Sequence, residues 1–421
     1  MASNSEKIIH VYADWQGLNT VMPLGKLFAQ RLHGKEIFYF EYNQAWLRSE
    51  YALYLDPHLG LYQGKQYLPE EKQNFGIFLD SSPDRWGKLL MRRKEAALAR
   101  KEGRKENTLY DSDYLLGVYD LHRMGGIRFK LQEDGSFQND QSEFASPPWT
   151  SLRELEYASL QLEKEDAIDD PDYLKWLSML VDPGSSLGGA RPKASVLDNN
   201  NHLWIAKFPS QNDTKDSGAW EMVLHQMAGA CHIEVPEAKM LQFTGKHHTY
   251  LSKRFDRTSE GKRIHFASAM TLLGHNDGED YHDGISYLEL VAFISRHSPE
   301  STVDLEQLWR RILFNILVSN TDDHLRNHGF LISKNGWRLS PAYDMNPNEY
   351  GSGLKLNISD TDNSLDIGLA MEVAGYFKLN TEKANKIRKE MITVILQWSG
   401  IAKTFGLSKN EIETMKSAFR V

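Results

Sequence analysis

Residues 320–327, Asn-Thr-Asp-Asp-His-Leu-Arg-Asn, carry the strongest chemical pattern in this chain. Asp322 and Asn327 stand in the spacing D-x-x-x-x-N, directly after an apolar segment at 308–318 that predicts a helix. A polar loop just past the end of such a helix is placed to face a cleft. There a carboxylate accepts or orients a hydroxyl proton, an amide oxygen binds a divalent cation, and Arg326 neutralises an anion. The spacing alone is common, so the neighbouring segments carry the argument further.

The segments that follow extend the pattern. Residues 329–340 predict a β-hairpin closed by an Asn-Gly turn at Asn335-Gly336. Just beyond the hairpin, Asp344 lies in Tyr-Asp-Met. A D-x-x-x-x-N loop, a hairpin and then an aspartate is the order of a protein-kinase site, in which Asn327 and Asp344 would hold Mg²⁺. For Asp344 taken alone, a buried structural carboxylate is the alternative.

Three further pieces lie upstream, again in kinase order. Residues 184–193, Gly-Ser-Ser-Leu-Gly-Gly-Ala-Arg-Pro-Lys, predict a turn whose backbone N–H groups suit phosphates. Lys207 ends the strand Trp-Ile-Ala-Lys as a clamp for nucleotide phosphates, and Glu221, on the helix from about Trp220, would hold it. Taken separately, the Gly-rich segment is explained by a plain turn and Lys207 by a position on the protein surface. Six pieces in one order over about 160 residues predict a phosphoryl-transfer site with Asp322 as base.

Composition limits the remaining classes of protein. The chain has 421 residues, 41% of them hydrophobic and 25% charged, which predicts a globular protein of two or three domains rather than a disordered one. The net charge of −8 argues against a bulk electrostatic grip on nucleic acid. Cys231 is the single cysteine, so no disulfide framework forms within one chain. The first residues lack a secretory pattern and no apolar run approaches a membrane span, so we expect a cytoplasmic protein.

Changes in composition predict three domains, 1–140, 141–255 and 256–421. The first begins with strands at 8–12 and 37–42 and continues with a helix at about 84–101, capped by Ser82 with Pro83 in its first turn. A stretch rich in Gly, Ser, Asn and Pro at 137–148 predicts a linker. The second domain carries the Gly-rich turn and Lys207. The third is mostly helical, with predicted helices at 284–297, 305–319, 383–405 and 408–418.

Taken together, these segments resemble the HipA kinases, the toxins of bacterial HipBA-type toxin–antitoxin pairs. The resemblance covers most of the chain, because Asp-Ser-Ser-Pro-Asp-Arg-Trp-Gly-Lys-Leu-Leu-Met at 80–91 also looks like the family. Its other motifs are at 184–193, 205–209, 253–257, 320–327 and 342–345. It implies an α+β fold: a divergent two-lobed protein-kinase-like fold with an extra N-terminal β-rich subdomain and an all-helical C-terminal lobe.

The resemblance also implies a function. Family members are ATP- and Mg²⁺-dependent Ser/Thr protein kinases that phosphorylate a translation component of the aminoacyl-tRNA synthetase class and so arrest growth. A HipB-like helix-turn-helix antitoxin restrains them, and it makes their contact with DNA indirect; no membrane is involved. They also phosphorylate a serine of their own Gly-rich loop. Matching the motif places that serine at Ser186, with Ser185 as the neighbouring alternative.

The family's site residues transfer to this chain motif by motif. By that resemblance Asp322 is the catalytic base, Asn327 and Asp344 are the Mg²⁺ ligands, and Glu221 supports Lys207. The implied ATP contacts are Gly188, Gly189, Ala190, Arg191, Pro192, Lys193, Lys207, Lys253, Arg254, Phe255, His324, Leu325, Arg326, Asn327, Tyr343 and Asp344.

Two positions depart from the family pattern. Lys253 stands at the hinge in place of a carboxylate, which leaves backbone contacts for adenine. Asp323 replaces a small residue beside the base and either adds a metal contact or points away. His324 and His328, four residues apart, are expected to fix the catalytic loop rather than bind a metal. Two other functions stay open: a small-molecule or lipid kinase with the same site, and a catalytically silent co-repressor that holds an antitoxin on DNA.

Overall fold

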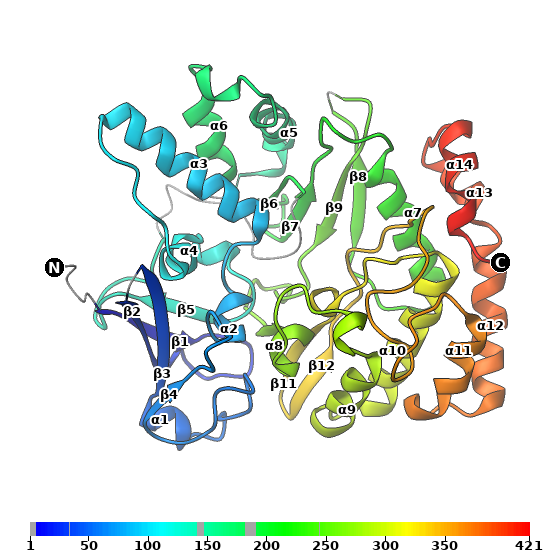
Figure 1. The fold of residues 1–421 in the computed structure, drawn as a ribbon, viewed down its shortest axis with the longest axis horizontal. Coiled ribbons are helices and arrows are strands. Elements are labelled where there is room, and N and C mark those ends of the chain that lie inside the picture. The colour runs from blue at the N-terminus through cyan, green and yellow to red at the C-terminus, as the bar shows by residue number, and fades with distance from the viewer. Residues whose placement is uncertain (1–5, 33, 141–146, 182–190, 244) are drawn as a thin grey trace. The chain divides into compact units, whose positions relative to one another are not determined.

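The computed structural model describes residues 6–32, 34–140, 147–181, 191–243 and 245–421, and the chain divides into two compact units (Figure 1). The first unit contains Met1–Gln211 and Asp256–Ala267, and the second contains Asn212–Phe255 and Ser268–Val421. Part of the predicted linker at 137–148 lies outside the described residues. The division into three domains stays a prediction.

An antiparallel sheet opens the first unit, and its five strands lie in the order β4-β3-β2-β1-β5. The strands predicted at 8–12 and 37–42 are confirmed as β1 and β3. Strand β2 lies between them in the chain, although Pro23, Gly25 and Lys26 weaken its β pattern. The strands are β1 (Glu6–Ala13), β2 (Met22–Leu32), β3 (Lys35–Tyr42), β4 (Lys65–Tyr67) and β5 (Ile127–Lys130).

Aromatic rings fill the core behind this sheet. Phe40 on β3 contacts Phe75 and Phe78, with ring centroids 6.4 and 5.6 Å apart, and Phe129 on β5 lies 6.0 Å from Phe78. All four rings are fully buried, and such pairs contribute beyond their area alone. Two one-turn helices, α1 (Gln44–Leu47) and α2 (Gly76–Leu79), carry the chain around this core.

The predicted helix at 84–101 is confirmed as α3 (Arg85–Glu102), although its cap differs from the expected one. Asp84 is the N-cap, and its Oδ1 accepts from the Gly87 N–H at 2.8 Å. Ser82 does not cap the helix, because its hydroxyl donates to the Phe78 carbonyl at 2.8 Å. The helix ends at Gly103, whose φ of 64° is the left-handed conformation that glycine adopts freely.

The remaining elements of the first unit form two groups. In Figure 1, α5 and α6 lie beside each other near α3, while β6 and β7 pair as an antiparallel hairpin. These elements are α4 (Asp111–Gly117), α5 (Leu152–Leu162), α6 (Tyr173–Val181), β6 (Lys193–Leu197) and β7 (Leu203–Lys207).

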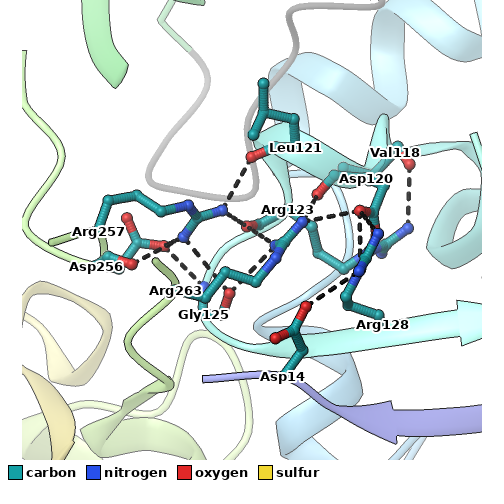
Figure 2. A network of polar contacts seen from close by, with 10 residues as sticks. All are labelled: Asp14, Val118, Asp120, Leu121, Arg123, Gly125, Arg128, Asp256, Arg257 and Arg263. Atoms are coloured by element: carbon teal, nitrogen blue, oxygen red, sulfur yellow. Dashed lines mark hydrogen bonds and ion pairs between the residues drawn. The ribbon is translucent and has the colours of Figure 1, made fainter. Parts of the chain in front are cut away.

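A buried network of arginines and aspartates holds segment 256–263 against residues 118–128 of the same unit (Figure 2). Asp120 accepts from Arg128 at 2.7 Å and from Arg263 at 2.9 Å. Arg257 donates to the carbonyls of Leu121 and Arg123, both at 2.9 Å. The segment that directly follows the predicted hinge therefore belongs structurally to the first unit.

Burial shifts the pKa values in this network. It lowers the pKa of Arg123, which is fully buried and donates to the Leu115 carbonyl at 2.8 Å, to about 9. Burial alone would raise the pKa of Asp120, but the charges of Arg263 and Arg128 hold it below its usual value. The carboxylate therefore compensates several buried cations at once.

Helices are the main regular elements of the second unit, and two of them begin at capping boxes. Ser286 caps α9 in a capping box with Glu289, and Ser408 does the same for α14 with Glu411. The helices are α7 (Ser217–Ala230), α8 (Ala269–Leu273), α9 (Tyr287–His297), α10 (Ser301–Leu317), α11 (Ile367–Glu372), α12 (Thr381–Ile395), α13 (Trp398–Thr404) and α14 (Lys409–Met415). The helix predicted at 383–405 is thus wrong in length, since it divides into α12 and α13.

Strands are also present in the second unit, as β8 (Ala238–Leu241) pairs with β9 (Thr249–Lys253). The predicted hairpin is confirmed as β11 (Gly329–Ser333) and β12 (Gly336–Leu339), so the C-terminal region contains strands as well as helices and is not all-helical. Ser333 pairs with Gly336, which makes Lys334 and Asn335 the two turn residues. Gly336 has no room for a side chain, because a Cβ there would lie 2.2 Å from the His297 carbonyl oxygen.

Helix α10 is the core of the second unit and leads directly into the predicted catalytic loop. Leu308, Trp309, Ile312 and Leu313 are fully buried, and the Trp309 indole donates to the Ala370 carbonyl at 2.8 Å. A rigid helix therefore fixes where the following loop begins. In the part of the chain that is described, no helix has the length and apolar character needed to cross a bilayer.

Candidate active site

The predicted site residues fall into two groups, one in each unit. Arg191, Pro192, Lys193 and Lys207 belong to the first unit, and the catalytic loop, the hinge, Glu221 and Asp344 belong to the second. The pairing of Lys207 with Glu221 joins residues of different units and stays a prediction. Five predicted residues lie outside the described part of the chain: Ser185, Ser186, Gly188, Gly189 and Ala190.

The catalytic loop is closed by hydrogen bonds between its two ends. The chain leaves α10 through Ser319, whose φ of 48° turns it sharply. The Asp322 carbonyl accepts from the His324 N–H at 3.1 Å and from Asn327 Nδ2 at 3.0 Å. The Asn327 amide is thus oriented by the backbone of the predicted base five residues earlier.

These contacts leave the Asp322 carboxylate and the Asn327 amide oxygen available for the predicted chemistry. The Asp322 side chain is exposed, and within the described residues no hydrogen bond or ion pair engages its carboxylate. Asn327 is buried and uses its amide nitrogen on Asp322, which directs its Oδ1 elsewhere. Hard oxygen donors of these types are the ligands that Mg²⁺ prefers.

Asp323 points away from Asp322 into the interior. Its Oδ2 accepts from the Tyr287 hydroxyl and lies 2.7 Å from His328 Nε2. Burial alone would raise the pKa of Asp323, but His328 and the Tyr287 hydrogen bond hold it below its usual value. Of the two roles left open for Asp323, the structure thus shows the inward one. His328, fully buried, fixes the loop as expected.

The segment that carries Asp344 is tied to the catalytic loop at two points. The Tyr343 hydroxyl donates to the Arg326 carbonyl at 2.7 Å, and the Asn346 N–H donates to Asn320 Oδ1 at 3.0 Å. Asp344 lies between these points with a φ of 59°, an unusual value for a residue with a side chain. The loop and the aspartate therefore form one connected piece of structure.

Two polar atoms in the predicted catalytic loop are buried without partners among the described residues. These atoms are His324 Nδ1 and Arg326 Nε, although Arg326 Nη1 also lies 3.3 Å from Asp277 Oδ2. Buried polar atoms normally find a partner, and the Arg326 donor fits a bound anion such as a phosphate. No group of three or more His, Cys, Asp or Glu side chains suited to a metal occurs in the described ranges. A divalent cation here would therefore need the Asn327 amide and ligands from a nucleotide in addition to Asp344.

Tyr250 on β9 lies close enough to Glu221 and Asp344 to respond to their charges. Burial raises the pKa of Tyr250 well above its usual value, and the nearby charges of Glu221 and Asp344 raise it further. Its hydroxyl lies 3.1 Å from His225 Nδ1, and burial lowers the pKa of His225 to about 4. His225 stands one helical turn after Glu221 on α7. Sequence reasoning missed this pair, because the two residues carry no motif.

At the predicted hinge, the backbone N–H of Lys253 already has a hydrogen-bond partner within the protein. Its N–H donates to the Glu237 carbonyl at 2.8 Å, and its Nζ lies 3.7 Å from Glu237 Oε2. A backbone contact from Lys253 to adenine would therefore come from its carbonyl. Arg254 is buried, and the Phe255 ring packs against Tyr343 with centroids 5.5 Å apart.

In the first unit, Lys193 is held by the 80–91 motif. Its Nζ lies 2.6 Å from Asp84 Oδ2, and its side chain is 2% exposed. Asp84 therefore both caps α3 and pairs with Lys193, a role that sequence reasoning missed. Lys207 stands directly opposite Lys193 in the β6–β7 ladder, so the two side chains leave the same face. Arg191 Nε donates to the Phe208 carbonyl at 3.1 Å.

Comparison with known proteins places these features in a family. Residues 185–399, about half of the chain, match the model described as "HipA-like C-terminal domain". A Haemophilus influenzae protein named "Putative kinase" is 27% identical over 179 residues, which is 38% of this chain and 52% of that protein. A Sinorhizobium fredii protein named "Putative kinase Y4dM" is 30% identical over 156 residues, 34% of this chain and 36% of that protein. The matches thus span about half, or less, of the relatives' lengths.

A solved structure covers nearly the whole chain. It is the HipA of the Shewanella oneidensis MR-1 toxin–antitoxin system, in a complex described as HipA, HipB and its operator DNA. The TM-score is 0.65 at 16% identity, over 97% of this chain and 94% of that one. The shared feature at this identity is the fold, which confirms the predicted α+β, kinase-like class.

Proposed function

The chain belongs to the family of the HipA-like C-terminal domain, and from that premise we propose that it is an ATP- and Mg²⁺-dependent Ser/Thr protein kinase. The observation that carries the proposal is the connected piece of structure formed by the catalytic loop and the Asp344 segment. It presents an exposed carboxylate, an oriented amide and two buried polar atoms that have no partner among the described residues. The names of the curated relatives support a kinase as well.

Each side chain has a defined role in this proposal. Asp322 accepts or orients the proton of the acceptor hydroxyl. Asn327 Oδ1 and the Asp344 carboxylate would hold Mg²⁺, which when bound supplies charge neutralisation for the nucleotide phosphates. His324 and Arg326 donate to phosphate oxygens. Lys207, supported by Glu221, contributes a further positive charge.

We extend the proposal to biology through the family. The chain would act as a growth-arrest toxin with a translation component, of the aminoacyl-tRNA synthetase class, as target. The Shewanella relative is described with HipB and operator DNA, which supports a HipB-like antitoxin as the partner of this chain and only indirect contact with DNA. Phosphorylation of its own Ser186, with Ser185 as alternative, would limit the activity.

The test is incubation of the purified chain with Mg²⁺ and γ-labelled ATP, beside Asp322→Asn and Ser186→Ala. We expect label in the wild type, at least a 100-fold lower rate in Asp322→Asn, and loss of most self-labelling in Ser186→Ala. Peptide mapping locates the label. Equal circular dichroism spectra establish that the variants are folded.

The other results separate the remaining functions. Full activity of a folded Asp322→Asn variant would refute the site assignment. Unchanged labelling of Ser186→Ala would move the modified residue to Ser185 or elsewhere. If no protein is labelled, the intact mass decides: a chain one phosphate heavier indicates a silenced kinase, and an unmodified chain favours a co-repressor or a small-molecule kinase.

A further inference from the structure

The second unit presents one aromatic ring to solvent next to the catalytic loop. Tyr350 is 84% exposed, the highest value among the large apolar and aromatic side chains of the described residues. It lies in a turn, residues 348–351, that follows the Asp344 segment. A lone exposed aromatic residue is ordinary on a flexible loop, so what distinguishes this one is how its turn is held.

One side of the turn is fixed to the start of the catalytic loop. The Asn348 N–H donates to the Ser319 carbonyl at 3.1 Å, and Asn348 Nδ2 donates to Thr321 Oγ1 at 2.8 Å. Thr321 directly precedes Asp322. Asn348 Oδ1 also accepts from the Tyr350 N–H at 3.0 Å. Tyr350 is thus positioned by the same residue that contacts the neighbour of the predicted base.

The turn also packs tightly onto Thr321. A Cβ added to Gly351 would lie 2.5 Å from Thr321 Cγ2, so no side chain fits between them. The Gly351 N–H donates to the Asn348 carbonyl at 3.1 Å, which closes the turn. Glycine at 351 therefore allows the close approach.

Contacts from distant parts of the second unit fix the other side. Lys215 Nζ lies 2.7 Å from Glu349 Oε2, and the Ser417 hydroxyl donates to the Glu349 carbonyl at 2.8 Å. Arg420 Nη2 donates to the Gly351 carbonyl at 2.9 Å, while its Nε donates to Ser319 Oγ at 3.0 Å. The backbone of the turn is thus immobilised on both sides, and only the ring of Tyr350 is left in water.

We propose that Tyr350 is the docking residue for the protein substrate, and that it contacts an apolar side chain beside the Ser or Thr that reaches Asp322. The inference rests on the proposed kinase function. A rigid backbone removes much of the entropy cost of binding, and tyrosine is enriched among residues that dominate interface energies. Beside the ring, the negative charge of Glu349 is paired with Lys215. Arg420 uses its guanidinium on the Ser319 hydroxyl and the Gly351 carbonyl. The exposed ring is thus the group presented to a substrate, and we expect apolar contact with it to select the substrate.

The test uses a peptide library as the probe, because it needs no knowledge of the natural target. Each peptide carries one central Ser or Thr, and one flanking position at a time is fixed to each amino acid. With Mg²⁺ and labelled ATP, the wild type should prefer a large aliphatic or aromatic residue at one flanking position. Tyr350→Ala should reduce that preference roughly tenfold, a loss typical of an exposed anchor, while the KM for ATP is unchanged.

Two variants serve as controls. Tyr350→Phe keeps the ring and should keep the preference. Tyr376→Ala removes another exposed tyrosine, 63% exposed in the 3₁₀ helix Val373–Phe377 of the same unit, and should leave the preference unchanged. Because both tyrosines are exposed, neither substitution is expected to disturb folding.

Each other outcome has a definite meaning. If the wild type selects at a flanking position and Tyr350→Ala selects equally, the docking role is overturned. The same holds if Tyr376→Ala loses the preference to the same extent, or if the wild type phosphorylates peptides with no apolar preference at all. If the wild type self-labels but phosphorylates no peptide, docking is also refuted. If it neither self-labels nor labels peptides, the proposed kinase function itself fails.

Discussion

Replacement of Asp120 by alanine probes the buried network of the first unit (Figure 2). Asp120 is 4% exposed and pairs with Arg128 and Arg263 at 2.7 and 2.9 Å. Its removal leaves the charge of Arg263, also buried, without its nearest carboxylate. Arg123 loses the same nearby negative charge.

The magnitude follows from what a lone buried charge costs. Removal of one partner from a buried ion pair typically destabilises a protein by ~3–5 kcal/mol. For a unit of roughly two hundred residues, each kcal/mol lowers the melting temperature by ~2–4 °C. We therefore expect Asp120→Ala to lower the melting transition of the first unit by ~6–20 °C.

The assay combines thermal unfolding with hydrogen exchange. In Asp120→Ala, amides at 256–263 should exchange much faster, because Arg257 and Arg263 anchor that segment. Asp14→Ala is the matched control, since Asp14 also pairs with Arg128, at 3.0 Å, but is about one-third exposed. An exposed pair contributes ~0–1 kcal/mol, so the control should melt within a few degrees of the wild type.

Two results would refute this reasoning. Equal melting temperatures for Asp120→Ala and Asp14→Ala would mean that burial does not govern the cost. Unchanged exchange at 256–263 in a destabilised Asp120→Ala protein would mean that the network does not anchor the segment.

Three further predictions concern single buried groups. Burial lowers the pKa of His265 to about 3, so below about pH 6.5 the unfolded chain binds a proton at this residue and the folded chain does not. The free energy of unfolding should therefore fall by ~1.4 kcal/mol per pH unit on acidification from pH 6.5. A His265→Phe variant whose stability, measured by urea titration, falls with the same slope would disprove this. Asp323→Asn should cost ~2 kcal/mol, because the Tyr287 hydroxyl loses a charged acceptor, and should lower kcat; unaltered unfolding in guanidinium would contradict it. Tyr250→Phe should cost ~1 kcal/mol through the lost contact with His225, and calorimetry of the two proteins side by side decides.

Local signals predicted the elements that carry their own pattern. The strands β1 and β3 are rich in β-branched and aromatic residues, and the helices predicted at 284–297 and 408–418 are present as α9 and α14. The helix expected before the predicted catalytic loop is also present as α10, since a buried helix and a polar loop differ sharply in composition.

Side-chain direction and long-range pairing escaped prediction. Asp323 gave no sign in the sequence that it would turn inward, because its partner Tyr287 lies 36 residues earlier. Asp84 pairs with Lys193 across 109 residues, which no spacing rule detects. The break between α12 and α13 at Leu396 has no Pro or Gly to mark it, so tertiary packing rather than propensity sets it.

The interleaved path of the chain has a consequence for synthesis on the ribosome. Arg263 reaches Asp120 across 143 residues, so the first unit lacks a part of itself until that segment has emerged. At translation rates of ~5–20 residues per second, the nascent N-terminal region waits ~7–30 s with Asp120 already made and its partner Arg263 missing. During that interval a chaperone would have time to bind the incomplete unit, and the first unit can complete its native structure only after residues 212–255 of the second have been translated.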